Sequence, residues 1–567
     1  KTLTVINNTQ KIVRKKVKDF DIEKISYEDQ KVFDLMSTGK TVGLFQIESA
    51  GMREALIQMR PNHIEDIIAL VALYRPGPMS NIPTYNDCKH GKQKPDYLHP
   101  LLEDILKPTY GVIIYQEQVM QIAQKLSGFT AGQADLLRRA MGKKKRAELE
   151  KQKQGFIAGA VKNGIAKDVA AGIFLKIEPF AEYGFNKSHA AAYAIISYQT
   201  AFLKTYYPEE FIAASMTMDI SNQNKLSEFY EELKRLKVEI VRPDINECFA
   251  DFRTIDNKFY YALGGIKAVG YEAISNIVEE RILNGKFESI HDFINRVNPK
   301  DINKLQLEGL VKAGAFDKLN PNRQALYNSI PAMIAKSKNI FDNKSANQID
   351  LFSDDESIQD DILIKIDDWK FEERLSKEFE AVGFFISDHP LNQFTEIFND
   401  YKITDYSGFI SNEDLKDSNI AATLLKVQER KTAKGNSYAV LKLTDLSSVF
   451  ELFIFSDALE LNREILKEGN SLILTLFKNI SNDENRLTRI NVQKIASLKN
   501  LFNSPINEVL FKLNSEEQVK KISTILKDEG KTVVSINLVK GDNILQFRLK
   551  NPRKLDRKSL NLLRNQE

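Results

Sequence analysis

The stretch LLRRAMGKKK, Leu136 to Lys145, places five cationic side chains within ten residues. Thr130 and Gln133 precede it with the spacing of a capping box, which predicts that a helix begins there. Like charges four residues apart destabilise a helix by roughly 0.2–0.5 kcal/mol per pair, and guanidinium groups bind phosphate oxygens in bidentate fashion. The stretch therefore predicts a helix that binds a multiply charged anion, and a solvated basic face is the alternative. The residues expected to pack against the protein are Leu136, Leu137, Ala140 and Met141.

A second candidate anion site follows in the heptapeptide YGFNKSH, which precedes an alanine-rich amphipathic run. Asn186 or Ser188 is suited to cap a helix, which the run predicts to continue to about Tyr206. Lys187 and His189 would then lie at the positive end of a helix dipole, where cations are unfavourable and a bound anion would compensate them.

Tyr183 opens the same heptapeptide and offers a flat ring on which a base could stack. For either residue singly, the alternatives are a packed Tyr183 and a hydrogen-bonded His189. Two phosphate-type sites on neighbouring helices jointly predict the binding of a nucleoside triphosphate.

Four segments of the chain resemble the fingers region of bacterial DNA polymerase III alpha subunits, the replicative C-family polymerases. The segments are ALYRPGP, YGVIIYQEQVMQIA, LLRRAMGKKK and YGFNKSHAAAYA. The resemblance follows the family's order along nearly the whole chain; it is strongest between Thr41 and Phe211 and weaker after about Leu391. It implies a fingers domain that holds the incoming deoxynucleoside triphosphate. The residues that it assigns to this nucleotide are Arg138, Arg139, Lys143, Lys144, Lys145, Tyr183, Asn186, Lys187 and His189.

Arg75 and Gln116 belong to the resembling segments, but the resemblance assigns them no individual role. In the family, three aspartates of the palm domain hold the metal ions, because phosphoryl transfer needs carboxylates around two ions about 3.5–4 Å apart. The last of these aspartates lies a few residues before a stretch similar to KTLTVIN, with which this chain starts at Lys1. The resemblance thus implies that the family's aspartates lie upstream of Lys1. We therefore expect no catalytic or metal-binding residue in this chain, Mg²⁺ held by residues outside it, and no polymerase activity of the chain alone.

Two groups of acids within the chain could substitute for the missing aspartates. Asp19 and Asp21 lie in the polar, lysine-flanked segment KDFDIEK, which is typical of a surface loop. Asp244 lies in RPDINECFADF, where the position two residues on is Asn246 and no third acid is placed to complete a site. Neither group predicts a metal site.

Composition predicts a large cytoplasmic protein of three or four domains. The chain has 567 residues, of which 43% are hydrophobic and 28% charged. Its net charge is only +3, so any affinity for DNA must come from local patches. Two cysteines are too few for a disulfide framework or a cysteine-based zinc site, and no apolar run approaches the ~18–20 residues of a membrane span. We expect no membrane among the partners.

The residue pattern and the resemblance together predict a multidomain fold. It is expected to be mainly α-helical through the fingers that the resemblance implies and through a helix–hairpin–helix region, followed by an all-β OB-fold barrel and a small mixed α/β C-terminal domain. The expected divisions are 1–40 for the exit from the palm, 41–241 for the fingers, 242–335 for the helix–hairpin–helix region with duplex DNA and clamp binding, 336–365 for a linker with a clamp-binding motif, 366–415 for a helical connector, 416–500 for the OB-fold and 501–567 for the C-terminal domain.

The hexapeptide GIKAVG precedes an amphipathic helix and has the pattern of a helix–hairpin–helix. Its glycines, Gly265 and Gly270, would allow the backbone to turn tightly, so that amides at the helix N-terminus face a DNA phosphate. These glycines and Lys267 are the candidate DNA-binding residues; a plain tight turn is the alternative, although the family has a hairpin at this place. The residues expected in the core of the helix are Ile274, Ile277, Val278 and Ile282.

The segment 336–361 is polar and acidic and cannot bury enough apolar surface to fold alone. It contains the pentapeptide QIDLF, whose Leu351 and Phe352 need a partner to cover them. Together with Gln348 and Asp350, they resemble the sliding-clamp-binding pentapeptide, which implies the beta clamp as a partner. The alternative is an anchor that fastens the linker to its own domain.

Beyond about Asp400 the hydrophobic pattern alternates, which predicts five short strands with one helix after the third, the layout of an OB-fold. Arg430, Lys431 and Lys434 fall in the expected first hairpin loop, where DNA could pass, although no ladder of exposed aromatics is evident. A structural barrel is the alternative. The family's C-terminal end contacts the clamp-loader tau subunit, and the resemblance further implies primer–template DNA and other holoenzyme subunits as partners.

Three functions remain open at this point. The chain is part of a replicative DNA-directed DNA polymerase that adds deoxynucleotides to a primer 3′ end, or a stand-alone, non-enzymatic adaptor for DNA and clamp, or a different nucleotide-binding enzyme. The third is disfavoured because the sequence has no G-x-x-x-x-G-K-[ST] loop.

Overall fold

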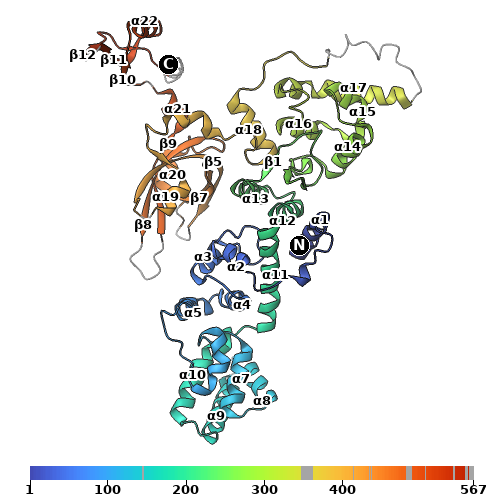
Figure 1. The fold of residues 1–567 in the computed structure, drawn as a ribbon, viewed down its shortest axis with the longest axis vertical. Coiled ribbons are helices and arrows are strands. Elements are labelled where there is room, and N and C mark those ends of the chain that lie inside the picture. Colours follow the sequence, from blue (N-terminus) through green and yellow to red (C-terminus); the bar gives the residue numbers. More distant parts are fainter. Residues whose placement is uncertain are drawn as a thin grey trace. The chain divides into compact units, whose positions relative to one another are not determined.

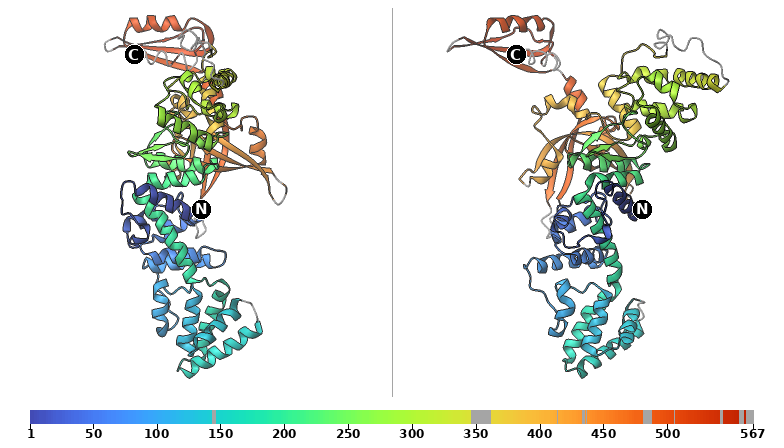
Figure 2. Two further views of the ribbon diagram at one scale, coloured as in Figure 1. Left: turned by 90° about the vertical axis from the view of Figure 1, so that its right-hand side faces the viewer. Right: turned by 45° about the vertical axis from the view of Figure 1, so that its right-hand side comes forward.

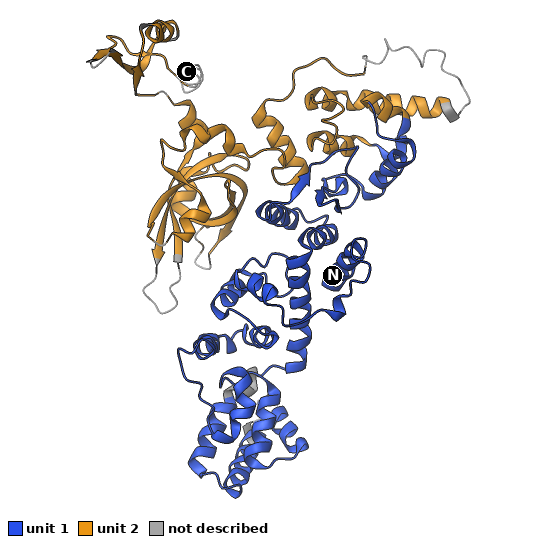
Figure 3. Cartoon of the chain, viewed as in Figure 1, with its two compact units in different colours: residues 1–288, 296–302 blue, residues 289–295, 303–567 orange. Residues whose placement is uncertain are grey.

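The computed structural model describes residues 1–567 except for several short segments, and it divides into two compact units (Figure 3). The first unit comprises 1–288 and 296–302, and the second comprises 289–295 and 303–567. The residues outside the description are 143–145, 346–361, 413, 433–434, 436, 481–487, 505, 541–542, 556–559 and 561–567.

The first unit is mainly helical, and its longest helix, α11, runs through the part of the unit that contains α2, α4 and α12 (Figure 1). Helices α2, α4 and α12 pack against α11, where Ala190, Ala194 and Ala201 are buried and let neighbouring helices approach closely. The predicted end of this helix at Tyr206 is confirmed. The helices are α1 (Thr2–Val13), α2 (Gln30–Ser37), α3 (Ala50–Met59), α4 (Ile64–Leu73), α5 (Ile82–Lys89), α6 (Glu103–Leu106), α7 (Gln116–Ser127), α8 (Ala131–Gly142), α9 (Arg146–Lys162), α10 (Lys167–Tyr183), α11 (Lys187–Tyr206), α12 (Pro208–Met218), α13 (Gln223–Arg235) and α14 (Tyr271–Asn284).

Helices α7 to α10 form a bundle of their own at one end of the first unit, which both views of Figure 2 show in light blue and teal. Its core contains Leu126, Leu137 and Phe156, all fully buried. The predicted packing face of α8 is correct for Leu137 and wrong for Leu136, which is 53% exposed, because successive helical residues differ by about 100° in direction. Ala140 is buried as predicted, and the Met141 side chain lies outside the description.

A small sheet and helix α14 complete the first unit. The strands β1 (Glu239–Val241), β2 (Arg253–Ile255) and β3 (Lys258–Tyr260) have the order β1-β3-β2. Asp256 and Asn257 join β2 to β3 with φ of 50° and 61°, the two-residue turn that suits a hairpin. In α14 the predicted core residues Ile274, Ile277 and Val278 are buried. Ile282 was predicted to be buried as well, but it is 67% exposed. It lies beyond the buried residues of the apolar face, towards the C-terminal end of the helix.

A buried ion pair connects α11 to α13 in the first unit. The Lys204 ammonium lies 2.7 Å from Glu232 Oε1 and donates to the carbonyl oxygens of Lys40 and Val42 at 2.9 and 2.8 Å. Arg235 donates to the same carboxylate, from Nε at 2.7 Å. Both side chains of the Lys204–Glu232 pair are almost fully buried, so the pair fixes α13 and the chain at 40–42 to the central helix.

Because of this pair, the stability of the first unit should fall as the pH is lowered into the acid range. Burial alone would raise the pKa of Glu232, but Arg235 and Lys204 outweigh burial and hold it below the ordinary value of 4.5. A carboxylate with a lowered pKa stabilises the fold above its unfolded-state pKa, and this stabilisation is lost as the pH falls through the folded-state pKa. Thermal unfolding of the helices, followed by circular dichroism, should therefore show a difference between wild type and Glu232→Gln that is full at pH 7 and shrinks below about pH 4.5.

Glu231→Gln is the matched control, because Glu231 is a half-buried neighbour whose partner is Lys234 on the same helix. Its difference from wild type should be small and nearly independent of pH. An equal effect of the two substitutions would show that the charge of Glu232 does not make the stability of the fold depend on pH.

The second unit begins with helices that are held together by a buried arginine, Arg323. The helices are α16 (Lys304–Lys312), α17 (Arg323–Ser345) and α18 (Phe371–Val382), followed by the 3-10 segment Pro390–Ile397; α15 (Ile290–Arg296) is divided between the two units.

A six-stranded sheet follows; its five long antiparallel strands, called the five-stranded sheet below, are the predicted ones, and the predicted helix follows the third of them. Hydrogen bonds order the strands β7-β6-β5-β8-β9, with the short β4 beside β5, and the inner face buries Leu424, Leu441 and Leu474. The number of strands and the place of the helix are therefore as predicted, while the OB-fold, with closure of the barrel between β7 and β9, stays a prediction. The elements are β4 (Ile403–Thr404), α19 (Tyr406–Ser411), β5 (Asp417–Lys431), β6 (Ser437–Thr444), β7 (Val449–Phe455), α20 (Ser456–Asn462), β8 (Ser471–Ile480), β9 (Thr488–Ser497) and α21 (Leu498–Asn503).

The last part of the described chain is the predicted small mixed α/β domain. Strands β10 (Glu508–Leu513), β11 (Glu529–Lys540) and β12 (Asn543–Arg548) form a sheet in that order, parallel between the first two and antiparallel between the last two. Helix α22 (Glu516–Ile525) connects the parallel pair. Among the described residues of the whole chain, no helix is long and apolar enough to cross a membrane.

Candidate functional site

Helix α8 begins as its sequence predicts. The backbone amide of Thr130 donates to Gln133 Oε1 at 2.9 Å, and the amide of Gln133 donates to Thr130 Oγ1 at 3.3 Å, which is the reciprocal pattern of a capping box. The capping box fixes the direction of the helix that carries the arginines.

The two arginines of α8 share one carboxylate, which the sequence argument missed. Arg138 donates to Asp135 Oδ1 from two nitrogens at 2.9 and 2.7 Å, and Arg139 Nε lies 2.7 Å from Asp135 Oδ2. The hydrogen bond from Arg138 lowers the pKa of Asp135. Asp135 thus offsets the like-charge repulsion expected for this stretch and orients both guanidinium groups. Lys143, Lys144 and Lys145 lie outside the described residues.

At the N-terminus of α11 the structure selects Asn186 as the cap: its Oδ1 accepts from the amide of His189 at 2.9 Å. An anion is already present at this helix end, and it is the carboxylate of Glu117. Asn186 Nδ2 donates to Glu117 Oε1 at 2.8 Å, and the amide of Lys187 lies 3.1 and 3.0 Å from the two oxygens. The predicted attraction of this helix end for negative charge is thus met from within the chain, by the first turn of α7.

Rings and cations alternate beside this helix end. The Arg75 guanidinium lies 4.2 Å from the ring centre of Phe185, which meets His189 edge to face at 5.3 Å. His189 in turn stacks on Tyr193 at 4.6 Å. Burial lowers the pKa of Arg75, as expected for a guanidinium partly removed from water. Tyr183 ends α10, and its side chain lies outside the description.

Backbone hydrogen bonds join the remaining two segments. The amide of Gln116 donates to the Phe185 carbonyl at 3.0 Å, and the amide of Phe185 donates to the Ile114 carbonyl at 3.2 Å. Arg138 Nη1 donates to Gln116 Oε1 at 3.3 Å, and the Lys187 ammonium lies 5.4 Å from the ring centre of Tyr115.

All four resembling segments therefore meet in one cluster, with Arg75, Gln116, Arg138 and Asn186 as one representative from each. Sequence reasoning did not find Asp135, Tyr115, Glu117 or Phe185 as members. The partners of Glu117 lie about seventy residues away, so only the tertiary structure shows them.

The structure corrects the turn geometry predicted for GIKAVG. Gly270 has φ −78° and N-caps α14, and Gly265 is likewise absent from the described glycines with positive φ. The left-handed residue is Ala268, with φ 63°, so the tight turn is made between the glycines. Close packing accounts for Gly265, since a Cβ there would lie 3.3 Å from the Phe252 ring. Lys267 is exposed, as a contact to an external partner requires.

The described residues do not fit a site for two Mg²⁺ ions. Asp21 accepts the Glu23 amide at 3.1 Å, while Asp244 is buried and accepts the Asn246 amide at 2.7 Å. Where the structure is described, no group of three or more His, Cys, Asp or Glu side chains could hold a metal ion. Asp21 and Asp244 are thus turn-forming residues.

Lys1, upstream of which the family's aspartates are expected, makes a structural contact within the first unit. It stands at the N-cap position of α1, and its ammonium pairs with Asp219, the C-cap residue of α12. The pair fastens the start of α1 to the end of α12, and the two helices pack against each other along their length. The expectation that the family's aspartates lie upstream of Lys1 concerns residues outside this chain and stays a prediction.

The outer face of the five-stranded sheet carries aromatics that the sequence argument did not expect. Arg430 pairs with Tyr438, which pairs with Phe455, so the three residues share one face; Phe453, two residues before Phe455, lies on it too. Phe453 and Phe455 are 52% and 63% exposed, and the rings of Tyr438 and Phe453 are 6.5 Å apart. The sequence showed no ladder of exposed aromatics beside the cations, because strand register rather than sequence spacing brings these rings together.

Two of the three predicted loop cations lie in a strand instead. Arg430 and Lys431 are the last residues of β5, whose pairing with β6 extends further than predicted. Lys434 lies outside the described residues, and so do all residues of the clamp-binding motif, Gln348, Asp350, Leu351 and Phe352.

Comparisons with known proteins match most of the chain to bacterial DNA polymerase III alpha subunits. Residues 2–164 match the model of the bacterial DNA polymerase III alpha subunit finger domain, and residues 237–326 match a helix-hairpin-helix motif. The DNA polymerase III subunit alpha of Caulobacter vibrioides is 40% identical over 476 residues, covering 84% of this chain and 42% of the relative.

The corresponding protein of Rickettsia bellii is 39% identical over 573 residues, covering 95% of this chain and 48% of the relative. That of Escherichia coli is 38% identical over 498 residues, covering 84% and 42% respectively. The chain thus spans less than half the length of these relatives. On these matches, the chain belongs to the family of bacterial DNA polymerase III alpha subunits.

Proposed function

We propose that this chain is the part of a replicative DNA-directed DNA polymerase that holds the incoming deoxynucleoside triphosphate. The intact enzyme adds deoxynucleotides to a primer 3′ end during chromosome replication. The observation that carries the proposal is the convergence of the four family segments on one cluster of cations, rings and a helix N-terminus.

The cluster supplies the groups that a triphosphate needs. Arg138 and Arg139 present guanidinium groups that are held by Asp135, and the first turn of α11 presents amides to an anion. Lys187 and His189 lie on that same turn, so the binding residues of the proposal are on two neighbouring helices. Lys143, Lys144, Lys145 and Tyr183 belong to the proposal on the resemblance alone.

The chemistry requires divalent metal, which we propose to be Mg²⁺. When bound in the intact enzyme, the metal would supply charge neutralisation at the transferring phosphate and activation of the attacking hydroxyl. From the family resemblance we propose that aspartates of the palm domain of the intact polymerase hold it; where the structure of this chain is described, no set of carboxylates fits the metal. The residues of this chain bind, orient and screen the nucleotide.

Primer extension tests this division of labour. The chain alone, given Mg²⁺, primer–template DNA and four deoxynucleotides, should not extend the primer, whereas the intact polymerase should. Extension by the purified chain would overturn the assignment of the metal ligands to other parts of the enzyme.

A second binding function, for single-stranded DNA, is supported by the outer face of the five-stranded sheet. Tyr438, Phe453 and Phe455 form a stacking surface beside Arg430, and a cation next to exposed rings is the combination that sequence-independent binders use. Lys431 follows Arg430 at the end of β5 and faces the other side of the sheet, so it belongs to the proposal only as a nearby cation. Lys434 in the adjoining hairpin loop is proposed to extend the stacking surface.

Removing both exposed rings of this face should weaken binding strongly. Stacking of one base on one aromatic ring contributes about 1–3 kcal/mol, so the double substitution Phe453→Ala and Phe455→Ala should lower affinity for a labelled oligothymidine roughly a hundredfold. Fluorescence anisotropy at fixed salt concentration measures it. Leu461→Ala, at an exposed position on α20, is the control, and equal affinities of all three proteins would remove this face from the account.

Two further contacts are proposed for duplex DNA and the sliding clamp. Gly265, Lys267 and Gly270 at the start of α14 would contact a phosphate of primer–template DNA, within the matched helix-hairpin-helix segment. The pentapeptide with Gln348, Asp350, Leu351 and Phe352 would bind the beta clamp.

Substitution of Leu351 and Phe352 by alanine should abolish capture of the purified clamp by this chain. The apolar anchors carry most of the binding energy of a short ligand, while extension of a short template by the intact polymerase should stay unchanged. Ile349→Ala changes the variable position of the pentapeptide and should retain capture. Capture by the double variant would sink the assignment.

The remaining proposals follow from the family alone. We propose that the segment 501–567 contacts the clamp-loader tau subunit and that other holoenzyme subunits bind the intact polymerase. We also propose that the intact polymerase works in the cytoplasm. The domain divisions 1–40, 41–241, 242–335, 336–365, 366–415, 416–500 and 501–567 are proposed on the same basis.

A further inference from the structure

Glu117 occupies the place at which a phosphate would be expected on α11. Its carboxylate accepts a hydrogen bond from Asn186 Nδ2 and a bifurcated hydrogen bond from the single N–H of the Lys187 amide, which lies close to both oxygens. Charge-assisted bonds of this kind are the ones that a phosphate oxygen would also make. The side chain is only partly buried, so solvent and solutes can reach it.

The charge of Glu117 is stabilised by two helix ends at once. It lies in the first turn of α7, the positive end of that helix, and contacts the positive end of α11. The neighbouring backbone holds these two ends together, since the Gln116 amide donates to the Phe185 carbonyl at 3.0 Å. The carboxylate therefore sits where α7 and α11 begin, within the cluster of the four segments.

A triphosphate and this carboxylate cannot both use the same amide of Lys187. At contact distance the two anions would also repel each other, more strongly where water is partly excluded. Cations for a displaced anion are close by, because Arg138 donates to Gln116, the residue next to Glu117.

We propose that Glu117 is a built-in competitor that fills the anion position on α11 while the nucleotide is absent and leaves it when the triphosphate binds. The proposal rests on the proposed nucleotide-binding function. Glu117 is a positioning residue, because it does not act on the nucleotide itself. It occupies the amide of Lys187 in the first turn of α11 and frees that amide when the triphosphate binds. Affinity for nucleotide is then lowered by the free energy of displacing the carboxylate.

Substitution of Glu117 by glutamine tests the competition, because the amide keeps the shape of the side chain and removes its charge. The full chain is titrated with dATP, and separately with inorganic tripolyphosphate, by isothermal calorimetry; Tm is recorded without ligand. Glu117→Gln should bind both anions roughly threefold to tenfold more tightly than wild type and unfold at a lower temperature. Glu150→Gln, at an exposed position on α9, removes the same charge and should change neither quantity.

The outcomes separate this inference from the function on which it rests. Weaker binding by Glu117→Gln, together with a lower Tm, would show a purely structural role and overturn the competition. Equal affinities of wild type and Glu117→Gln would overturn it while leaving the nucleotide site intact. Absence of binding by both proteins would remove the nucleotide site itself, and the competition with it.

Discussion

Replacing Arg138 by alanine in the intact polymerase is expected to lower kcat/KM for the incoming deoxynucleotide by about tenfold to a hundredfold. A hydrogen bond to a charged group contributes about 1.5–3 kcal/mol, and each 1.4 kcal/mol corresponds to a factor of ten. The structure supports an effect near the upper end, because Arg138 is held from both sides by Asp135 and Gln116 and is therefore preorganised. Single-nucleotide incorporation under steady-state conditions measures the ratio.

Three further variants sharpen this test. Arg138→Lys keeps a cation but loses the planar fork that reaches Asp135 and Gln116 together, so it should recover only part of the activity. Lys151→Ala removes a cation from an exposed position on α9 and should leave the ratio unchanged. Arg139, whose side chain is more exposed than that of Arg138, should show a smaller loss as alanine. Unchanged kinetics of Arg138→Ala would exclude this side chain from the triphosphate site.

Replacing Arg323 by methionine is expected to destabilise the second unit by about 3–5 kcal/mol, since removal of one member of a buried ion pair leaves the other charge unpaired. Arg323 lies 2.7 Å from Asp317 Oδ2 and 3.3 Å from Glu378 Oε2, and it donates to the Lys312 carbonyl at 3.0 Å. Glu378 is almost fully buried and would lose its cationic partner. Its other oxygen accepts the amides of Ile386 and Ser387, both at 2.7 Å, so the loss would spread from α17 to the chain beyond α18.

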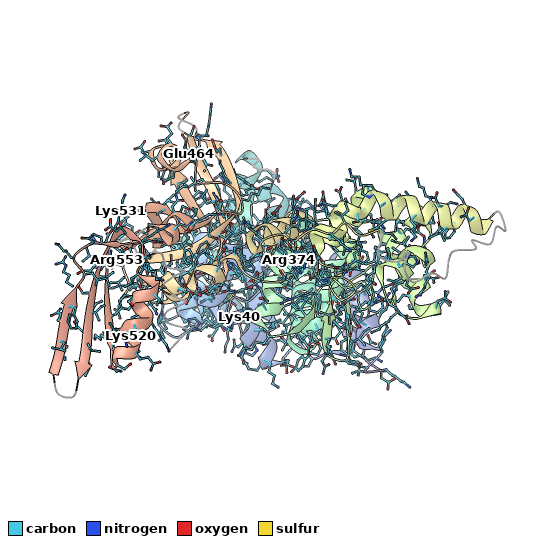
Figure 4. The ribbon with its side chains drawn as sticks, turned by 90° about the horizontal axis from the view of Figure 1, so that it is seen from above. Lys40, Arg374, Glu464, Lys520, Lys531 and Arg553 are labelled. Carbon is cyan, nitrogen blue, oxygen red and sulfur yellow. The ribbon has the colours of Figure 1, made fainter. Side chains whose placement is uncertain are left out.

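The single tryptophan of the sequence, Trp369, is buried in the second unit, and its ring lies tilted against that of Tyr327 with the ring centres 5.4 Å apart, so its fluorescence during urea unfolding reports on this unit. Arg374, labelled in Figure 4, is the control. It binds Asp317 and Asp368 at 3.0 and 2.6 Å but is far more exposed, so Arg374→Met should cost about 1 kcal/mol or less. Equal losses for the two substitutions would show that burial does not decide the strength of this network.

Sequence reasoning was sufficient where a feature is local. The capping box of Thr130 and Gln133 and the Asn186 cap are contained within four residues, and the structure confirms both. The alternating strands and the helix after the third strand are local patterns too, and they were also predicted correctly.

Sequence reasoning failed where partners are distant. Glu117 is one polar residue among many in its segment, and only folding places it against Lys187. The aromatic face of the sheet depends on the register between β6 and β7, which brings Tyr438 opposite Phe455. Leu136 and Ile282 were wrongly predicted to be buried on the apolar faces of their helices. Helical spacing shows which residues share a face, but it does not show how far the neighbouring elements cover that face.

Hydrogen exchange of the full chain with and without saturating deoxynucleoside triphosphate tests the central claim most directly. With nucleotide bound, we expect slower exchange in the last turns of α8 and in the first turn of α11 at Lys187 to Ala190, and little change in the second unit. Protection confined to the second unit, or none in α8 and α11 at saturating nucleotide, would contradict the assignment of the four-segment cluster to the incoming nucleotide.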